Sequence, residues 1–192
     1  DTICCALGAR DTDLVKLAGE FAGATEPGSE CVLWGTDTKL SAAGAAWANA
    51  VASKHLGMDD SHRVCGHVAA ELVPLAIALC EQRGMSGKEL VTIIAAGYDV
   101  FGAIQPGVKV AQRERGLDHK SQAGTLASAV VAALAMGLDT DKIANALALS
   151  MDMASGTEQY VFDAGLCDTK DLLSGYAVRN GMYAAQLAEA GF

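Results

Sequence analysis

Aromatic residues are scarce in this 192-residue chain, at 5%, and there are only three prolines, whereas hydrophobic residues make up 51%. Large rings therefore cannot fill much of the interior, and alanine and glycine must carry a large share of it. Small side chains let helices approach closely, so we expect tightly packed helices around a core of Leu, Val, Ile and Met. The length suits a single domain and is sufficient to bury a core.

Several motifs are missing, and each absence argues against a class of protein. The six cysteines show no CxxC spacing, so we expect reduced thiols in a cytoplasmic protein. There is no HExxH motif, no pair of histidines four residues apart, no GxSxG elbow and no phosphate-binding glycine loop. Metal, nucleophile-triad and nucleotide sites are therefore not indicated. We also find no signal peptide and no apolar run long enough to span a bilayer, and so expect no membrane partner.

Basic residues are outnumbered, 14 to 23, which gives a net charge of -9. An acidic chain without a basic stripe argues against nucleic-acid binding. It does not exclude an acidic substrate, because a small anion responds to the local field of its pocket.

Helical periodicity dominates what is present and predicts an all-α fold. Ser41, Ser86 with Glu89, and Asp139 are capping residues for three of the helices. One short strand is expected at 31–36, with irregular connections at 57–67, 105–120 and 156–170. The pattern indicates about seven helices, at 11–22, 42–56, 67–84 (with a kink at Pro74), 88–104, 122–137, 140–155 and 171–191.

The irregular connections hold most of the polar chemistry, as loops on a rigid scaffold usually do. The stretch "HLGMDDSHRVCGH", residues 55–67, contains three of the four histidines. A metal site at His62, Cys65 and His67 lacks a zinc spacing, and polar loop residues explain the stretch better. What remains are residues suited to proton transfer or to binding a carboxylate: Asp60, Ser61, His67, Asp118, His119 and Lys170.

The stretch "GTDTKLSAAGAAWANAVASKHLGMDDSH" resembles a segment of the MmgE/PrpD family. The resemblance continues through "LVPLAIALCEQRGMSGKELVTIIAAGYDV", "AGTLASAVVAALAMGLDTDKIANALALSMDMASG" and "DTKDLLSGYAVRNGMYAAQLAEAGF". It implies a large helical domain, a smaller α/β lid domain and homodimers. All of residues 1–192 map to the helical domain as one unit, without the lid or the first helices. The chain has no initial Met and ends on an ordinary helix end, so we expect it to be part of a longer polypeptide.

The resemblance also implies roles for single residues. His67 matches the family's catalytic histidine, Ser61 matches a threonine, and Lys170 in "DTK" matches a substrate-binding lysine. In that reading His67 is the general acid or base, Lys170 binds a carboxylate and Ser61 orients the substrate. Asp60 either tunes His67 or caps the next helix, and Lys170 could also be an ordinary lysine at a helix start.

Three positions depart from the family pattern. Gly57 stands where many members have an active-site aspartate, and Leu173 where some carry a histidine. In "GLDHKSQAG", Asp118 falls on a histidine of the family pattern and His119 on a proline, although a slip of one residue would return His119 to the pocket.

The family includes 2-methylcitrate dehydratases, cis-aconitate decarboxylases and iminodisuccinate epimerases, which act on small di- and tricarboxylates. The resemblance therefore implies a cofactor-independent lyase, with dehydration of a 2-methylcitrate-like substrate as the first expectation. Epimerisation, decarboxylation or a non-catalytic dimerising scaffold are the alternatives. We expect a homodimer, because the alanine-rich stretches "AAGAAWANAVA" and "AGTLASAVVAALA" present small-residue faces too extensive for one thin layer of helices. We also expect His67, Ser61 and Lys170 to share one cleft, with His55 and His62 outside it.

Overall fold

The computed structural model describes residues 1–63, 66–162 and 168–192, and over these it is helical, as the sequence predicts. The first half carries α1 (Thr2–Ala9), α2 (Asp13–Thr25), α3 (Ala42–His55) and α4 (Ala69–Arg83). The second half carries α5 (Gly87–Glu114), α6 (His119–Ala135), α7 (Thr140–Met153), α8 (Gln159–Phe162) and α9 (Thr169–Ala190). The described residues therefore form nine helices instead of about seven, because α1, in the opening stretch "DTICCALGAR" that was expected to be helical, and the short α8 were not among the seven counted.

The strands form one small hairpin between α2 and α3. Strand β1 (Pro27–Val32) pairs antiparallel with β2 (Lys39–Leu40), which places Cys31 opposite Leu40. The strand expected at 31–36 thus begins four residues earlier, and the residues after Val32 form the turn instead.

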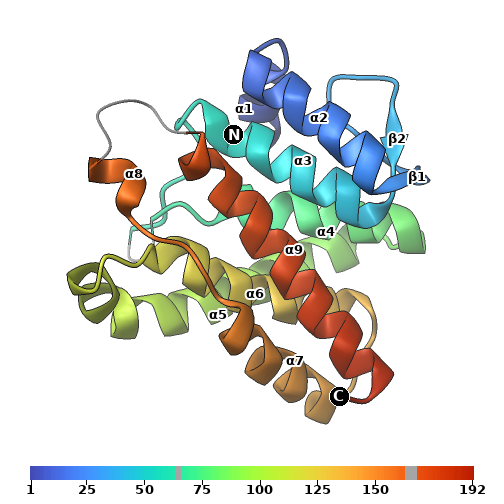
Figure 1. Cartoon of the computed structure of the whole chain (residues 1–192). Coiled ribbons are helices and arrows are strands. Elements are labelled where there is room, and N and C mark those ends of the chain that lie inside the picture. Colours follow the sequence, from blue (N-terminus) through green and yellow to red (C-terminus); the bar gives the residue numbers. More distant parts are fainter. Residues whose placement is uncertain (64–65, 163–167) are drawn as a thin grey trace.

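Helix α9 lies across the middle of the molecule, with α1, α2 and α3 on one side and α5, α6 and α7 on the other (Figure 1). It packs most extensively against α6, and also against α7 and α3. Helix α4 joins the two sides by contacting α3, α6 and α9. The largest fully buried side chains come from this centre and from α5, among them Val51, Leu72, Leu75, Phe101 and Val178.

The alanine-rich helices are buried within this one chain. Twelve of the 14 residues of α3 and 13 of the 17 residues of α6 are buried without any second copy. The small residues of α6 face other helices of the same chain, whose backbones approach closely. At Gly181 of α9, for example, an added Cβ would lie 2.6 Å from the Thr125 carbonyl oxygen of α6. The reason given above for a homodimer is therefore wrong, because these faces are not available to a partner.

Helix boundaries differ from expectation in the segment 105–120. Helix α5 continues through Pro106 to Glu114, and α6 begins at His119 because the Asp118 side chain accepts the Ser121 N–H at 2.7 Å. Most of the supposed irregular connection is thus helical. Its residual loop, 115–118, is pinned by the backbone, since the Asp118 N–H donates to the Gly156 carbonyl at 3.1 Å.

Helix α5 bears on the expectation that no apolar run is long enough to span a bilayer. It is the single helix among the described residues that is long and apolar enough, by length and composition alone, to cross a membrane. One such helix is weak evidence for a span. Its buried residues, which include Ile93, Gly97 and Phe101, face the rest of the fold, where α5 packs against α6 and α4.

Candidate functional site

The two neighbouring aspartates of the loop after α3 have different partners. Asp60 Oδ1 accepts the backbone N–H groups of Ala69, at 3.0 Å, and Val68, at 3.4 Å, so it caps α4. Its Oδ2 accepts the Tyr98 hydroxyl at 2.7 Å. Burial, followed by this hydrogen bond to Asp60, raises the pKa of Tyr98. Of the two roles considered for Asp60, the contacts support the cap.

Asp59 is the aspartate that reaches His67. Its side chain is fully buried, with Oδ1 3.3 Å from His67 Nδ1 and Oδ2 3.4 Å from Lys54 Nζ. The His67 contact is within ion-pair distance but lacks hydrogen-bond geometry, since both of its atoms have no hydrogen-bond partner. Asp59 therefore lies between the histidine and a buried lysine at the end of α3, and it accepts a hydrogen bond from that lysine at 3.4 Å.

Lys54 lines a small pocket where α3, α4, α6, α8 and α9 meet, which we call the lysine pocket. Its volume is about 20 Å³, which is room for about one water molecule, and it is partly open to solvent. Three lysines from three helices converge on it, with two carboxylates between them. The lining residues are Lys54, Glu71, Asp118, Lys120, Ser121, Tyr160, Lys170, Leu173 and Ser174.

The two carboxylates of the lysine pocket are held differently. Asp118 has both oxygens engaged, one by the Ser121 N–H and the other by the Tyr160 hydroxyl at 2.7 Å. Glu71 accepts the Ser174 hydroxyl on Oε1 at 2.9 Å, while its buried Oε2 has no hydrogen-bond partner among the described residues. Asp118 is thus an N-cap of α6 that also faces the pocket, whereas Glu71 keeps one oxygen unused.

Glu71 is also the carboxyl group whose ionisation the fold changes most clearly. Burial raises its pKa from 4.5 to about 7, against the opposing effects of the Lys54 charge and the Ser174 hydrogen bond. Nearby Asp59 and Asp118 add to the increase. Near neutral pH this group therefore exists in both its charged and its neutral form.

The predicted site residues do not all lie together. Asp118 and Lys170 line the lysine pocket, and His67 adjoins it through Asp59 and Lys54. Ser61 is exposed and is not among the lining residues. Cys65 lies outside the described residues.

His119 is buried but faces another group. Its Nδ1 lies 3.6 Å from Glu158 Oε1, which also lies 3.4 Å from Arg113 Nε. Burial lowers the pKa of His119. It does not line the lysine pocket, so it and Asp118 are neighbours in sequence that point to different surroundings.

The remaining histidines are placed as follows. His55 is the last residue of α3, and its Nδ1 lies 2.8 Å from Asp171 Oδ2. His62 is exposed, with its ring 6.3 Å from that of Tyr98. Neither lines the lysine pocket. Among the residues that the structure describes, no group of three or more His, Cys, Asp or Glu side chains is arranged to hold a metal ion.

Two of the positions that depart from the family pattern, Leu173 and Gly57, lie at or next to the lysine pocket. Leu173 lines the pocket. Gly57 has a φ of +63°, and a Cβ added there would lie 3.8 Å from Lys170 Nζ. An aspartate at position 57 would therefore bring a carboxylate towards the Lys170 ammonium, which in this chain has no acidic ion-pair partner among the described residues.

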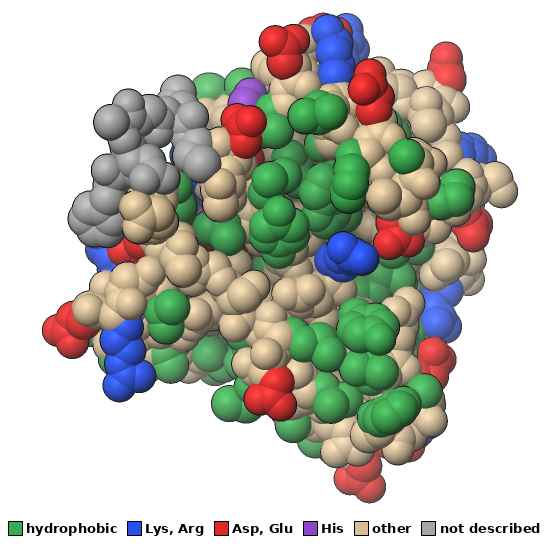
Figure 2. Space-filling model, in the orientation of Figure 1, with side chains coloured by type: hydrophobic (Ala, Val, Ile, Leu, Met, Phe, Trp, Pro, Cys, Tyr) green, Lys and Arg blue, Asp and Glu red, His purple; other side chains and the backbone are tan. Residues whose placement is uncertain are grey.

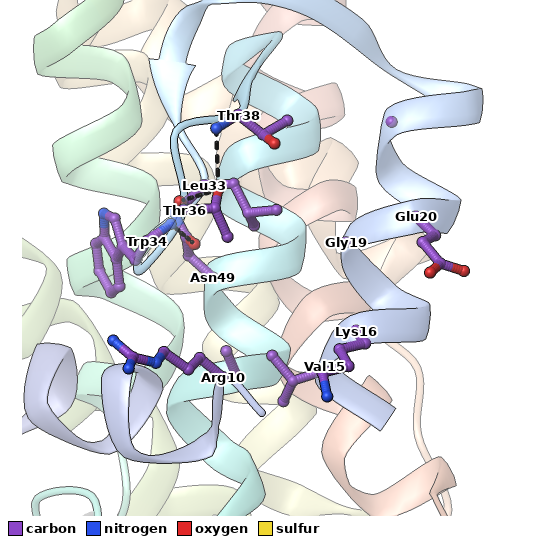
Figure 3. Close-up of a pocket in the computed structure, with 12 residues that line it drawn as sticks. Arg10, Val15, Lys16, Gly19, Glu20, Leu33, Trp34, Thr36, Thr38 and Asn49 are labelled. Carbon is purple, nitrogen blue, oxygen red and sulfur yellow. Dashed lines mark hydrogen bonds between the residues drawn. The ribbon is translucent and has the colours of Figure 1, made fainter. Parts of the chain in front are cut away.

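A larger hollow elsewhere carries less chemistry. It has a volume of about 370 Å³ and lies among the end of α1, α2, the hairpin turn and α3. Arg10, Lys16 and Glu20 reach its edges from α1 and α2 (Figure 3). Its one buried polar side chain, Asn49, is committed to the backbone at Val32 and Trp34. With no histidine and no buried ionisable group in its lining, it is a weaker candidate than the lysine pocket.

Sequence reasoning missed Lys54 and Glu71 as site residues, and it matched Asp59 only to an aspartate pair of the family without giving it a role. Lys54 and Glu71 lie inside buried helices, and the only signal was a charged residue in a helix whose other residues are mostly buried. The sequence gives no cue that Glu71 meets Ser174, since 103 residues separate them.

Comparison of the sequence with known proteins identifies the family. The model for the MmgE/PrpD N-terminal domain matches residues 1–192. Human cis-aconitate decarboxylase is 27% identical over 197 residues, covering 100% of this chain and 40% of that protein. The mouse cis-aconitate decarboxylase is 28% identical over 186 residues, covering 94% of this chain and 37% of its own length. The chain thus spans well under half of these relatives, and by its match to the domain model over all 192 residues it belongs to the MmgE/PrpD family.

Proposed function

We propose that the polypeptide containing this chain is a cofactor-independent lyase for small polycarboxylates, with dehydration of a 2-methylcitrate-like 2-hydroxy tricarboxylate as its reaction. The observation that carries the proposal is the convergence of three lysines on one pocket. Membership of a family that includes cis-aconitate decarboxylases agrees with a carboxylate substrate.

The charges of the pocket favour a substrate with more than one carboxylate. Lys54 is balanced by Asp59, which lies 3.4 Å from it. Lys120 and Lys170 have no acidic ion-pair partner among the described residues, and both face the pocket from the starts of α6 and α9. Two ammonium groups that form no ion pair of their own and face one small space suit two carboxylates of one molecule, each held as a point charge.

His67 is the proton-transfer residue of this proposal. A histidine can take a proton from a carbon made acidic by a neighbouring carboxylate, and Asp59 stabilises the imidazolium that results. The pocket fits about one water molecule, so a tricarboxylate would bind with the long Lys120 and Lys170 side chains displaced outward. Lys170 and Lys120 then anchor the carboxylates, and His67 acts from the Asp59 side.

Ser61, His119 and Asp118 contribute less in this proposal. Ser61 is exposed, so it would orient a substrate only from outside the pocket. His119 faces Glu158, and Asp118 is already used as a cap and as the acceptor for Tyr160. We therefore give these three residues supporting roles around the pocket.

Decarboxylation is the second candidate, and the names of the relatives favour it. The same lysines would hold the substrate while the C–CO₂⁻ bond breaks and the electron pair stays on carbon. A proton from the site would then complete the product. The two reactions share their binding residues and differ in whether water or carbon dioxide leaves.

The deciding experiment incubates the complete natural polypeptide with 2-methylcitrate, citrate, cis-aconitate and iminodisuccinate. Products are followed by proton NMR, and carbon dioxide release is measured separately. We expect turnover of a hydroxy tricarboxylate without carbon dioxide. Release of carbon dioxide from cis-aconitate would favour the second candidate, and no turnover of any of the four would contradict the proposal.

Variants of two lysines test the binding role. Lys170→Met should raise KM at least tenfold, because a buried carboxylate loses its counter-charge. Lys88→Met, on the exposed start of α5, is the matched control and should leave KM unchanged. Equal effects of the two substitutions would contradict the assignment of the lysine pocket.

A further inference from the structure

Glu71 is a carboxyl group that the proposed function does not need for anchoring an anionic substrate. It lies on α4 at the inner wall of the lysine pocket and is 3% exposed. Helix α6 makes room for it at Gly124, where an added Cβ would lie 3.2 Å from Glu71 Cγ. Glu71 is therefore one of two carboxyl side chains in a pocket lined by three lysines, and unlike Asp118 it does not cap a helix.

The bonding of Glu71 is incomplete on one side. Oε1 accepts the Ser174 hydroxyl, but Oε2 is buried and has no hydrogen-bond partner among the described residues. A buried carboxylate with an unused oxygen is costly, whereas a neutral carboxyl group can offer its O–H to a group that enters the pocket. The lining of the pocket includes Glu71, so a bound molecule would meet it directly.

We propose that Glu71 is the general acid of the site, which in its neutral form gives its proton to the leaving hydroxyl of the substrate. This inference rests on the proposed function. His67 takes the proton from carbon, and the C–H electron pair forms the new C=C bond. The C–O bond breaks with its electron pair on oxygen, and the Glu71 proton completes the water that leaves. Glu71 is then ionised and His67 protonated, and exchange with solvent restores both.

The surroundings of Glu71 suit both of its forms. Burial favours the neutral form, and Asp59 and Asp118 add to this, so its pKa lies at about 7. Once the proton is given up, the Lys54 charge and the Ser174 hydroxyl stabilise the carboxylate. A proton donor works best with a pKa near the working pH. The charged or titratable groups that face it are Lys54 from α3, Asp59 from the following loop, Asp118 and Lys120 from the start of α6, Tyr160 from α8 and Lys170 from α9.

The pH dependence of kcat/KM tests this role in the complete polypeptide. Because the neutral carboxyl is the active form, kcat/KM should fall as pH rises through about 7. Glu71→Gln keeps the size and can still accept from Ser174, but it has no proton to give. It should lower kcat by about 10²- to 10⁴-fold and remove that fall. Glu81→Gln, the same substitution on the exposed end of α4, should leave the profile unchanged.

A second variant separates proton transfer from packing. Ser174→Ala removes the hydrogen bond that lowers the Glu71 pKa, so the fall in kcat/KM should move to higher pH. A purely structural Glu71 would give lower activity at every pH without such a shift, which would overturn the inference even if Glu71→Gln did not fold. Unchanged kcat in a folded Glu71→Gln would overturn it too. An inactive wild type would instead contradict the proposed function.

Discussion

At the scale of single residues, the two adjacent aspartates in the loop after α3 make different contacts. Asp60 turns to the first N–H groups of α4 and to Tyr98, while Asp59 turns inward to Lys54 and His67. The direction of a loop side chain follows from the backbone around it, and the sequence "DD" does not show which residue faces inward. The two residues therefore differ in what their loss should do.

Asp60→Ala should destabilise the fold more than an ordinary cap. It removes the acceptor for the N–H groups of Ala69, at the start of α4, and of Val68 just before it, and it leaves the half-buried Tyr98 hydroxyl without its acceptor. We expect a loss of about 2–3 kcal/mol in the free energy of unfolding, measured in urea. Asp139→Ala, which removes only the exposed cap of α7, should cost about 1 kcal/mol. Similar losses for Asp60→Ala and Asp139→Ala would show that the hydrogen bond from Tyr98 adds nothing to the free energy of unfolding.

His67→Ala should abolish turnover while the fold stays intact. The side chain is 31% exposed, so little buried area is lost, but the proton-transfer group disappears. His62→Ala, in the same loop, should be nearly neutral in kcat/KM. Circular dichroism shows whether both variants fold. An active His67→Ala, or an inactive His62→Ala, would mean that the histidines have been assigned in the wrong order.

The raised pKa of Glu71 should also make the free energy of unfolding depend on pH. Its pKa is raised from 4.5 to about 7 on folding, so between these values the folded state holds a proton that the unfolded chain releases. The stability of the wild type relative to Glu71→Gln should therefore fall as pH rises from 4.5 to about 7, by about 3 kcal/mol in total. Urea unfolding of both proteins at several pH values measures this. A difference that stays constant with pH would contradict the raised pKa.

At the scale of helices and strands, local signals predicted some boundaries and long-range contacts decided the others. Ser41 caps α3, and Ser86 with Glu89 forms the capping box of α5, as the spacing indicates. The end of α5 differs from the irregular connection expected at 105–120, where Pro106 and Gly107 are residues that usually interrupt a helix. The helix nevertheless continues, and Gln112 near its end donates to Gln122 of α6. Such contacts between helices have no local signature.

The crossing of α6 and α9 gives a prediction for two glycines. An added Cβ at Gly181 would lie 2.5 Å from Ser128 Cβ, whereas one at Gly107 in α5 meets nothing within 4 Å. Gly181→Ala should therefore cost about 1–3 kcal/mol, although alanine favours a helix. Gly107→Ala should stabilise the protein by about 0.5–1 kcal/mol. Thermal unfolding shifts of the same sign for both would mean that α9 can move away from α6.

At the scale of the whole molecule, the structure brings together only part of the cluster that the family resemblance implied. Lys170 and Asp118 line the lysine pocket, whereas Ser61 and His67, which were expected to share a cleft with Lys170, do not line it. Glu71 and Lys54 line it without having been expected. The all-α class followed from periodicity, because helices repeat a local pattern. The composition of a pocket depends on how five helices cross, and single-sequence periodicity does not contain that geometry.

The homodimer remains a prediction, and the exposed apolar side chains offer it a surface. Figure 2 shows hydrophobic side chains gathered over α2 and α9. They border a groove lined by residues that include Leu14, Leu17, Phe21, Leu172 and Tyr176. Leu17 is 60% exposed and Phe21 52%, which is unusual for large apolar side chains clustered on one face. We propose that a second copy of the protein covers this groove.

Light scattering of the complete polypeptide tests the dimer. We expect twice the monomer mass at micromolar concentration, and a monomer when Phe21→Glu is introduced into the groove. Met151→Glu, at an equally exposed apolar position on α7, is the control and should remain dimeric. A dimer that survives Phe21→Glu would place the interface elsewhere, and a wild-type monomer would contradict the prediction.

The central position of α9 has a consequence for synthesis on the ribosome. This helix is the last of the described elements, yet it packs against α3, α4, α6 and α7 and brings Lys170 and Ser174 to the pocket. The alanine-rich surfaces of α3 and α6 therefore leave the ribosome well before the helix that covers them. A nascent chain that stalls before Thr169 exposes apolar surface suited to chaperones and to aggregation, and it has no complete site.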